Sequence, residues 1–184
     1  MHRRNLSEAI ERYHLRYPQE IEAVQRFRKL LAEYPNCFER TCWAGHITGS
    51  AWLVDASGEQ LLLTNHRKLK MWLQLGGHSD GDANTSGVAY REAVEESGLK
   101  VALLSEEIFD IDIHEIPAAK GDPAHYHFDV RYQLRAENRD FVVSEESLDL
   151  AWVPINDLEK YTQETSILRM REKWRAENSK NFSK

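Results

Sequence analysis

Three glutamates, Glu92, Glu95 and Glu96, share one face of a predicted helix, because residues three and four positions apart are neighbours on a helix surface. Like charges in this arrangement repel each other, and a divalent cation such as Mg²⁺ or Mn²⁺ relieves the repulsion by taking carboxylate oxygens as ligands. Gly76 and Gly77 stand in a predicted glycine-rich loop (76–81) before the helix, where backbone carbonyls can approach a cation or a phosphate closely. The pattern therefore predicts a metal and phosphate site, and the alternative is a solvated acidic helix.

The segment 77–99 resembles the Nudix box, whose pattern is G-x5-E-x7-R-E-U-x-E-E-x-G-U, where U is an apolar residue. The match consists of Gly77 and the run Arg91-Glu92-Ala93-Val94-Glu95-Glu96-Ser97-Gly98-Leu99. Average residue usage makes this combination rare by chance. The resemblance to the Nudix hydrolase superfamily is specific within the box and follows the element order of the family over residues 45–160.

One position departs from the pattern, because Ala83 stands where the family has its first glutamate. In the family that glutamate pairs with the arginine that matches Arg91 and braces the loop against the helix. The loss concerns the geometry of the loop more than metal binding. We expect Asp80 or Asp82 to pair with Arg91 in its place.

The resemblance implies an α/β fold, a Nudix-type α/β/α sandwich with a mixed β-sheet, and a requirement for Mg²⁺ or Mn²⁺. The residues that match the family's catalytic positions are Arg91, Glu92, Glu95 and Glu96. The implied metal ligands are the Gly76 carbonyl and the carboxylates of Glu92, Glu95 and Glu96. Nudix proteins often add a carboxylate from outside the box, and Glu145 or Glu146 is best placed by order along the chain; we take Glu146.

Two groups of residues are candidates for the substrate site. Segments 108–116 and 125–134 alternate polar and apolar residues, so pairing of two such strands would gather their polar faces into one patch. In that patch His127 or Arg131 would meet a phosphate or a base, whereas the alternative is a solvated sheet face with cross-strand ion pairs. His66 and Arg67 begin a basic cluster that either faces the anionic end of a substrate or forms a solvated loop.

These residues require strands and helices that hold them in place. Residues 47–54 and 61–64 are predicted to form a hairpin, followed by a short strand at 71–75, the box helix ending near Gly98, further strands at 101–104, 108–116 and 125–134, and a last helix near 167–174. Residues 18–34 have the periodicity of an amphipathic helix, and a shorter helix precedes Pro18. We therefore expect a helical extension at 1–40 and a Nudix domain at 41–184. The extension packs either on that domain or on a second subunit, which would make a homodimer.

Composition restricts the function classes. The chain has 184 residues and a net charge of −6, which disfavours binding of long nucleic acid by bulk electrostatics. Its opening residues lack the apolar core of a signal peptide, and no apolar run is long enough to cross a membrane, so we expect a cytoplasmic protein that does not span a membrane. Cys37, Cys42 and His46 together are a candidate zinc site, against the alternative of buried or idle thiols.

The resulting hypothesis is a metal-dependent hydrolase that cleaves a pyrophosphate bond in a nucleoside diphosphate linked to another group. Ala83 supports the alternative of a non-catalytic Nudix-fold module that binds nucleotides. A second alternative is an enzyme similar to the Nudix-fold isopentenyl diphosphate isomerases. That chemistry needs a reactive cysteine beside the metal site, and Cys37 and Cys42 precede the first predicted strand.

Overall fold

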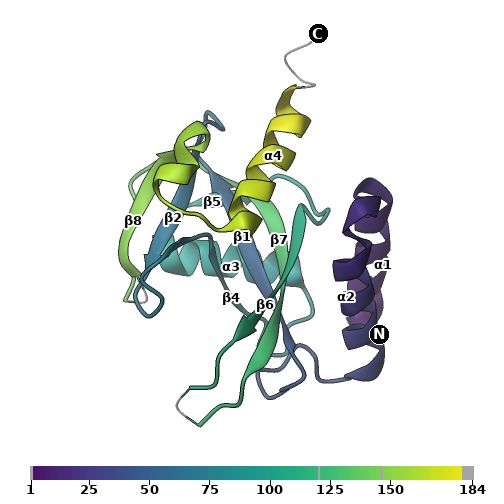
Figure 1. Ribbon diagram of the computed structural model, residues 1–184. Helices are drawn as coiled ribbons and strands as arrows, with labels where there is room; N and C mark the ends of the chain where they lie inside the picture. The colour runs from purple at the N-terminus through teal and green to yellow at the C-terminus, as the bar shows by residue number, and fades with distance from the viewer. Residues whose placement is uncertain (1, 120, 146, 180–184) are drawn as a thin grey trace.

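The computed structural model describes residues 2–119, 121–145 and 147–179. The chain begins with two helices that lie side by side, α1 (His2–Arg16) and α2 (Ile21–Glu33), joined by the 3₁₀ turn η1 (Pro18–Glu20) (Figure 1). Pro18 suits the first turn of a helix because it has no N–H to leave unpaired. No helix in the described parts of the chain is long and apolar enough to cross a membrane.

A mixed β-sheet forms the centre of the molecule. Its strands are β1 (His46–Val54), β2 (Gln60–His66), β3 (Trp72–Leu73), β4 (Leu75–His78), β5 (Val101–Leu103), β6 (Asp110–Ile116), β7 (His125–Ala136) and β8 (Ser147–Pro154). The order is β3-β2-β1-β7-β5, with β4 also paired to β1, β6 to β7 and β8 to β2. The central pair β1·β7 is parallel and the other pairs are antiparallel.

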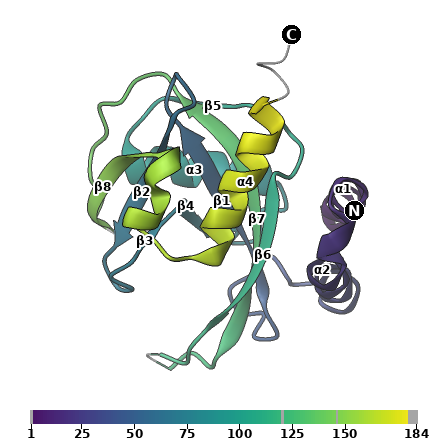
Figure 2. The same ribbon diagram turned by 45° about the horizontal axis from the view of Figure 1, so that its top comes forward.

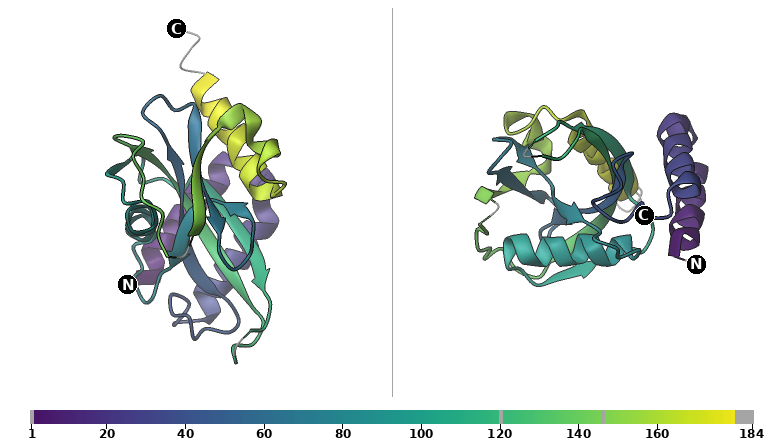
Figure 3. Two further views of the ribbon diagram at one scale, coloured as in Figure 1. Left: turned by 90° about the vertical axis from the view of Figure 1, so that its left-hand side faces the viewer. Right: turned by 90° about the horizontal axis from the view of Figure 1, so that it is seen from below.

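Helices cover both sides of this sheet. The box helix α3 (Thr85–Ser97) lies on one side, and the 3₁₀ helix η2 (Ile155–Lys160) and α4 (Thr165–Ser179) lie on the other, as Figures 1 and 3 show. One hydrophobic cluster joins α3 to β1 and β7, and a second joins α4 and η2 to β1 and β2. The expected α/β/α sandwich with a mixed sheet is therefore confirmed.

The N-terminal helices pack against this domain instead of standing apart. Leu6, Ile10 and Tyr13 are buried in the same hydrophobic cluster as β1 and β7. Phe27 packs edge-on against Phe128, with ring centroids 5.2 Å apart. Figure 2 shows the helical pair beside the β6–β7 edge of the sheet. The division at residue 40 stays a prediction, because the helices share their apolar cluster with the sheet.

The glycine-rich segment differs from the expected loop. Gly76, Gly77 and His78 belong to β4, which pairs with β1 in the register Ser50↔Gly76 and Gly49↔Gly77. A Cβ at Gly76 would lie 2.7 Å from the Cβ of Ser50, so a side chain would force these strands apart. The glycines looked like loop residues in the sequence, but they allow close packing within a strand. The predicted strand at 71–75 is correspondingly divided between β3 and β4.

Candidate active site

Two box glutamates of α3 converge on the backbone of β4. The Oε1 atom of Glu96 accepts a 2.8 Å hydrogen bond from the Gly76 N–H, and Glu96 is buried. The carboxylate of Glu92 fills the space beside Gly77, where an added Cβ would lie 2.5 Å from the Glu92 Cδ. Glu95 lies on the same helix and is exposed. The structure thus brings two of the three predicted carboxylates, Glu92 and Glu96, to the Gly76–Gly77 backbone.

Arg91 connects α3 to β4 at this point. Its Nη2 atom donates to the carbonyl of His78 and to Glu92 Oε1, both at 2.9 Å. The hydrogen bond with Glu92 is the main reason why the pKa of Arg91 is raised above its ordinary value. One guanidinium therefore fixes both the orientation of the carboxylate and the distance between helix and strand.

The substitution at Ala83 is compensated differently from our expectation. Asp80 pairs with Arg40, with 2.6 Å between Oδ2 and Nη2. Asp82 accepts a 2.8 Å hydrogen bond from the Asn84 N–H, and only its charge acts on Arg91. The bracing of the loop is therefore divided: Arg91 holds β4 and α3, while Arg40 holds the turn that contains Asp80.

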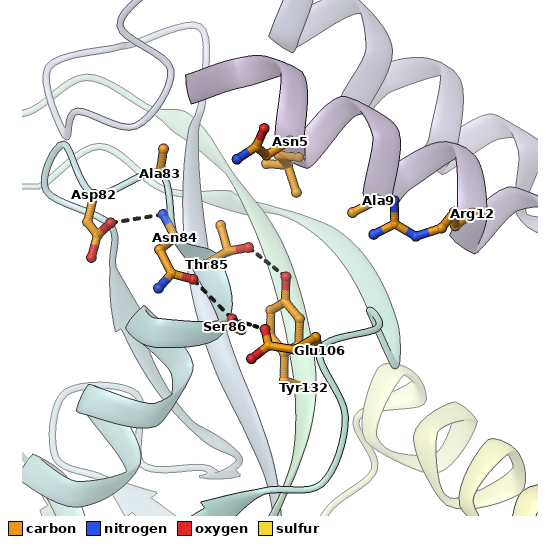
Figure 4. Close-up of a pocket in the computed structure, with 11 residues that line it drawn as sticks. Asn5, Ala9, Arg12, Asp82, Ala83, Asn84, Thr85, Ser86, Glu106 and Tyr132 are labelled. Carbon is orange, nitrogen blue, oxygen red and sulfur yellow. Dashed lines mark hydrogen bonds between the residues drawn. The ribbon is translucent and has the colours of Figure 1, made fainter. Parts of the chain in front are cut away.

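Ala83 itself lines a pocket between α1 and the start of α3 (Figure 4). The pocket has a volume of about 400 Å³. Two of its lining residues, Thr85 and Tyr132, share a 2.6 Å hydrogen bond between Oγ1 and OH, and Asn5 of α1 also lines it. The small side chain at position 83 leaves this space open beside the N-terminal helix.

The donor set beside β4 fits a hard divalent cation. The glutamate carboxylates and the Gly76 carbonyl offer oxygen atoms, which Mg²⁺ and Mn²⁺ prefer. The missing side chain at Gly77 leaves room for the Glu92 carboxylate against the backbone. The predicted ligand Glu146 lies outside the described residues. Its neighbour Glu145 is exposed.

The basic cluster after β2 holds the segment that contains Glu145. Arg67 donates from Nε to the Glu145 carbonyl and from Nη2 to the Ser147 carbonyl, both at 2.8 Å. The ring Nδ1 of His66 accepts a 3.3 Å hydrogen bond from the Leu69 N–H. Arg67 thus positions the loop that precedes β8, a role that its sequence context did not indicate.

The polar faces of β6 and β7 meet as predicted. The strands pair in the register Asp110↔Arg131 and His114↔His127, so their polar side chains form one patch. The patch differs from a solvated sheet face because Arg131 is only 2% exposed. Its guanidinium pairs with Asp129 at 2.7 Å and with Asp110 at 3.1 Å. The positive charge of Arg131 is therefore already balanced by carboxylates of the protein.

Residues that the sequence analysis missed complete this buried network. Arg169 of α4 bonds to Asp110 at 2.7 Å, and Lys173, one turn later, bonds to Asp110 at 2.6 Å. From the other side, Thr48 and Ser50 donate to Asp129 at 2.9 and 2.7 Å. The sequence does hold a sign of these partners: Arg169 and Lys173 are four residues apart, so both cations lie on one face of α4, the face toward the sheet.

The two cysteines are poorly suited to nucleophilic chemistry. Both are buried, and burial raises the pKa of the Cys37 thiol to about 11. Burial also raises the pKa of Cys42. Because the thiolate is the reactive form, neither residue is activated at neutral pH. This chemistry disfavours the isomerase alternative.

Comparisons with known proteins agree with this geometry. The family model described as NUDIX domain matches residues 46–173. A NUDIX-family hydrolase from Clostridium perfringens is 27% identical with a TM-score of 0.54, over 70% of this chain and 95% of that one. The comparison with curated proteins found no match.

Two more distant solved structures share the fold. An Ap4A hydrolase from C. elegans is 18% identical with a TM-score of 0.58, over 72% of this chain and 97% of that one. A UDP-X diphosphatase is 15% identical with a TM-score of 0.54, over 95% of this chain and 93% of that one. The second alignment is long enough to include the N-terminal helices.

Proposed function

Because the chain belongs to the NUDIX domain family, we propose that it is a divalent-metal-dependent hydrolase that cleaves a pyrophosphate bond in a nucleoside diphosphate linked to another group. The observation that carries this proposal is the convergence of Glu92 and Glu96 on the Gly76–Gly77 backbone. A solvated acidic helix would leave these side chains in water. Here one is buried and the other fills the space that a glycine leaves open.

The proposed metal ligands are Glu92, Glu95, Glu96 and the carbonyl of Gly76, with Glu146 as the ligand from outside the box. Bound Mg²⁺ or Mn²⁺ would neutralise charge on the pyrophosphate and make a water molecule more acidic. The rest of the chemistry belongs to the side chains. One box glutamate accepts the proton of the attacking water, whose oxygen forms a bond to phosphorus as the phosphoanhydride P–O bond breaks.

Arg91 is proposed to position Glu92, since it holds that carboxylate and β4 at the same time. We place the anionic end of the substrate near His66, the last residue of β2, and near Arg67, which follows it and donates to the Glu145 carbonyl. His127 of β7 is proposed to border the substrate site. Arg131 is buried among carboxylates, so we assign it to holding Asp129 in place beside that site.

The test is release of phosphate-containing products from a panel of nucleoside diphosphate derivatives, with Mg²⁺ and with Mn²⁺. We expect turnover by the wild type and a loss of at least about 100-fold in Glu96→Gln. The matched control is Glu172→Gln on α4, an exposed glutamate with ion-pair partners on its own helix. We expect this variant to retain full activity.

The principal alternative is a module that binds a nucleotide without hydrolysis, and the open pocket beside Ala83 is the observation that favours it. It predicts a thermal shift with members of the panel and no turnover by the wild type. That result would contradict the hydrolase proposal. Equal activity of wild type and Glu96→Gln would also contradict it.

A further inference from the structure

Imidazole rings gather where β1 and β7 begin, outside the carboxylate cluster of α3. His46 is the first residue of β1 and lies opposite His127 in the parallel register, while His125 precedes His127 by two residues on the same face. The ring centroid of His46 lies 4.8 Å from that of His127 and 4.9 Å from that of His125. We call these three residues the histidine cluster.

The nitrogen atoms of the histidine cluster converge. One ring nitrogen from each residue lies within 4.8 Å of the other two. His46 is 2% exposed, and within the described parts of the chain neither of its ring nitrogens has a partner at good hydrogen-bond geometry, although the Cys42 backbone interacts with the ring. The buried Nε2 of His127 likewise lacks such a partner in those parts of the chain. Buried polar atoms are nearly always paired, so three orphaned nitrogens at one place require an explanation.

The hydrogen bond of His125 suits coordination. His125 Nδ1 lies 2.9 Å from the carbonyl of Pro123, which can only accept, so Nδ1 carries the proton and Nε2 keeps a free lone pair. Metal-bound histidines are typically oriented by a partner of this kind. Neutral imidazoles are the form that binds a metal.

The donor type selects the metal. Imidazole nitrogen suits Zn²⁺, Ni²⁺ and Cu²⁺, whereas Mg²⁺ prefers oxygen. Tetrahedral Zn²⁺ with bonds of about 2.0 Å needs ligand nitrogens roughly 3.3 Å apart. The nitrogens of the histidine cluster would therefore have to approach one another by up to about 1.5 Å, through side-chain rotation on binding.

We propose that His46, His125 and His127 bind a divalent transition metal ion, Zn²⁺ in the first instance, at a site that is distinct from the box carboxylates. The ring of His78 lies close by, with its centroid 4.9 Å from that of His127 and 5.2 Å from that of His46. The site joins the ends of two central strands, β1 and β7. It differs from the candidate zinc site of Cys37, Cys42 and His46, because His46 faces imidazoles from β7.

The test uses the full chain without a histidine tag, stripped of metal with a chelator. Zn²⁺ is titrated by calorimetry in excess Mg²⁺, which fills oxygen sites and competes weakly for imidazole. We expect one equivalent of Zn²⁺ to bind and to raise Tm. In a parallel titration, Co²⁺ should give the intense visible absorption of a tetrahedral nitrogen site.

The variants His125→Gln and His127→Gln should each weaken Zn²⁺ binding by about 100-fold or more, since even loss of a ligand's orienting partner typically costs about 10–100-fold. The control His14→Gln removes an imidazole on α1, outside the histidine cluster, and should bind like the wild type. Far-UV circular dichroism checks that each variant is folded.

Two results would overturn the proposal. One is the absence of Zn²⁺ binding by the wild type in excess Mg²⁺. The other is Zn²⁺ binding that both folded histidine variants retain and Glu96→Gln loses, because this would place the ion at the carboxylates. Neither result depends on turnover, so failure of this proposal is separable from failure of the proposed hydrolase activity.

Discussion

Single atoms decide whether the carboxylates can lie against β4, and Gly77 is the clearest case. An added Cβ there would come within 2.5 Å of the Glu92 Cδ, so Gly77→Ala must displace the carboxylate. We predict a loss of about 10–100-fold in kcat/KM at low Mg²⁺, with partial recovery at high Mg²⁺, because the ligand geometry is disturbed and the ligands remain. The measurement is kcat/KM as a function of Mg²⁺ concentration.

The control for Gly77→Ala is Gly121→Ala, where an added Cβ meets nothing within 4 Å. This residue lies in the loop between β6 and β7, and its positive φ makes alanine locally strained without affecting α3. We expect its Mg²⁺ dependence to match the wild type. An unchanged Mg²⁺ dependence in Gly77→Ala would show that Glu92 takes no part in metal binding.

Asp112 gives a prediction about pH. Burial of Asp112 raises its pKa, but the His114 hydrogen bond and the charges of Arg131 and Arg169 outweigh burial and hold the pKa well below its ordinary range. The folded protein therefore binds fewer protons here than the unfolded chain, whose Asp has a pKa of about 3.9. The stabilisation is fully present above about pH 5 and is lost as pH falls below about 4.

We therefore expect Asp112→Asn to lower Tm at pH 7, and we expect its difference from the wild type to begin to shrink as pH falls from 5 to 3. Thermal unfolding across this range measures the difference between the two proteins. Asp157→Asn is the control, because its partner Lys160 is exposed and the pair contributes little to stability. A difference between wild type and Asp112→Asn that stays constant with pH would refute the prediction.

Alternation along β7 predicted which residues share a face, but burial of that face was not predictable. The sequence placed His127, Asp129 and Arg131 together, and the register with β6 confirmed it. Their partners come from distant parts of the chain: Thr48 and Ser50 of β1 bond to Asp129, while Arg169 and Lys173 of α4 bond to Asp110, the ion-pair partner of Arg131. The faces of a strand follow from a local pattern, whereas these contacts depend on how distant segments fold together.

At the scale of elements, the N-terminus of α3 fixes the position of the box. Asn84 is the N-cap, and its Oδ1 accepts hydrogen bonds from the Gly87 N–H at 3.2 Å and from Ser86 Oγ at 3.0 Å. We predict that Asn84→Ala lowers the free energy of unfolding by about 1 kcal/mol, because it leaves a helix N–H unpaired. Urea unfolding monitored by circular dichroism measures this change.

Asn84→Ser keeps a side-chain oxygen at the cap and is the matched control. It should recover most of the stability that Asn84→Ala loses. Equal destabilisation by both variants would mean that the amide acts through Ser86 and the pocket wall instead of the cap. Either way the change is local to the start of α3, about two turns before the box glutamates.

The elements were predictable where a local signal defines them. Gly98 ends α3 in the left-handed conformation, with φ 68°, as its lack of a side chain predicted. The short strand β4 was missed because Gly76 and Gly77 have the composition of a loop. Their strand conformation depends on pairing with β1, which lies more than twenty residues earlier in the chain. The local sequence around the two glycines does not indicate that pairing.

The whole molecule depends on contacts that join the two ends of the chain. The periodicity of residues 18–34 predicted an apolar face, but not what covers it. The structure packs Phe27 against Phe128 of β7, so the helices complete the core of their own chain. From the sequence, packing of these helices on their own domain and packing on a second subunit were equally acceptable, because an apolar face does not identify the surface that covers it.

Lys173 links the C-terminal helix to the N-terminal helices, and it gives the last prediction. Its Nζ lies 2.6 Å from Glu20 Oε1 and 2.6 Å from Asp110 Oδ1, and it is 7% exposed. In Lys173→Ala, Asp110 keeps Arg131 and Arg169, whereas Glu20 loses this buried cation. Removing one partner of a buried pair costs about 3–5 kcal/mol, so we expect a loss of about 3 kcal/mol in the free energy of unfolding.

The matched control is Lys160→Ala, whose exposed pair with Asp157 should contribute less than about 0.5 kcal/mol. Because Glu20 lies between α1 and α2, the loss in Lys173→Ala should also loosen these helices. Hydrogen exchange should therefore rise in α1 and α2 before it rises in β1 or β7. Uniformly faster exchange across the chain would mean that the N-terminal helices unfold only together with the sheet, as part of one cooperative core.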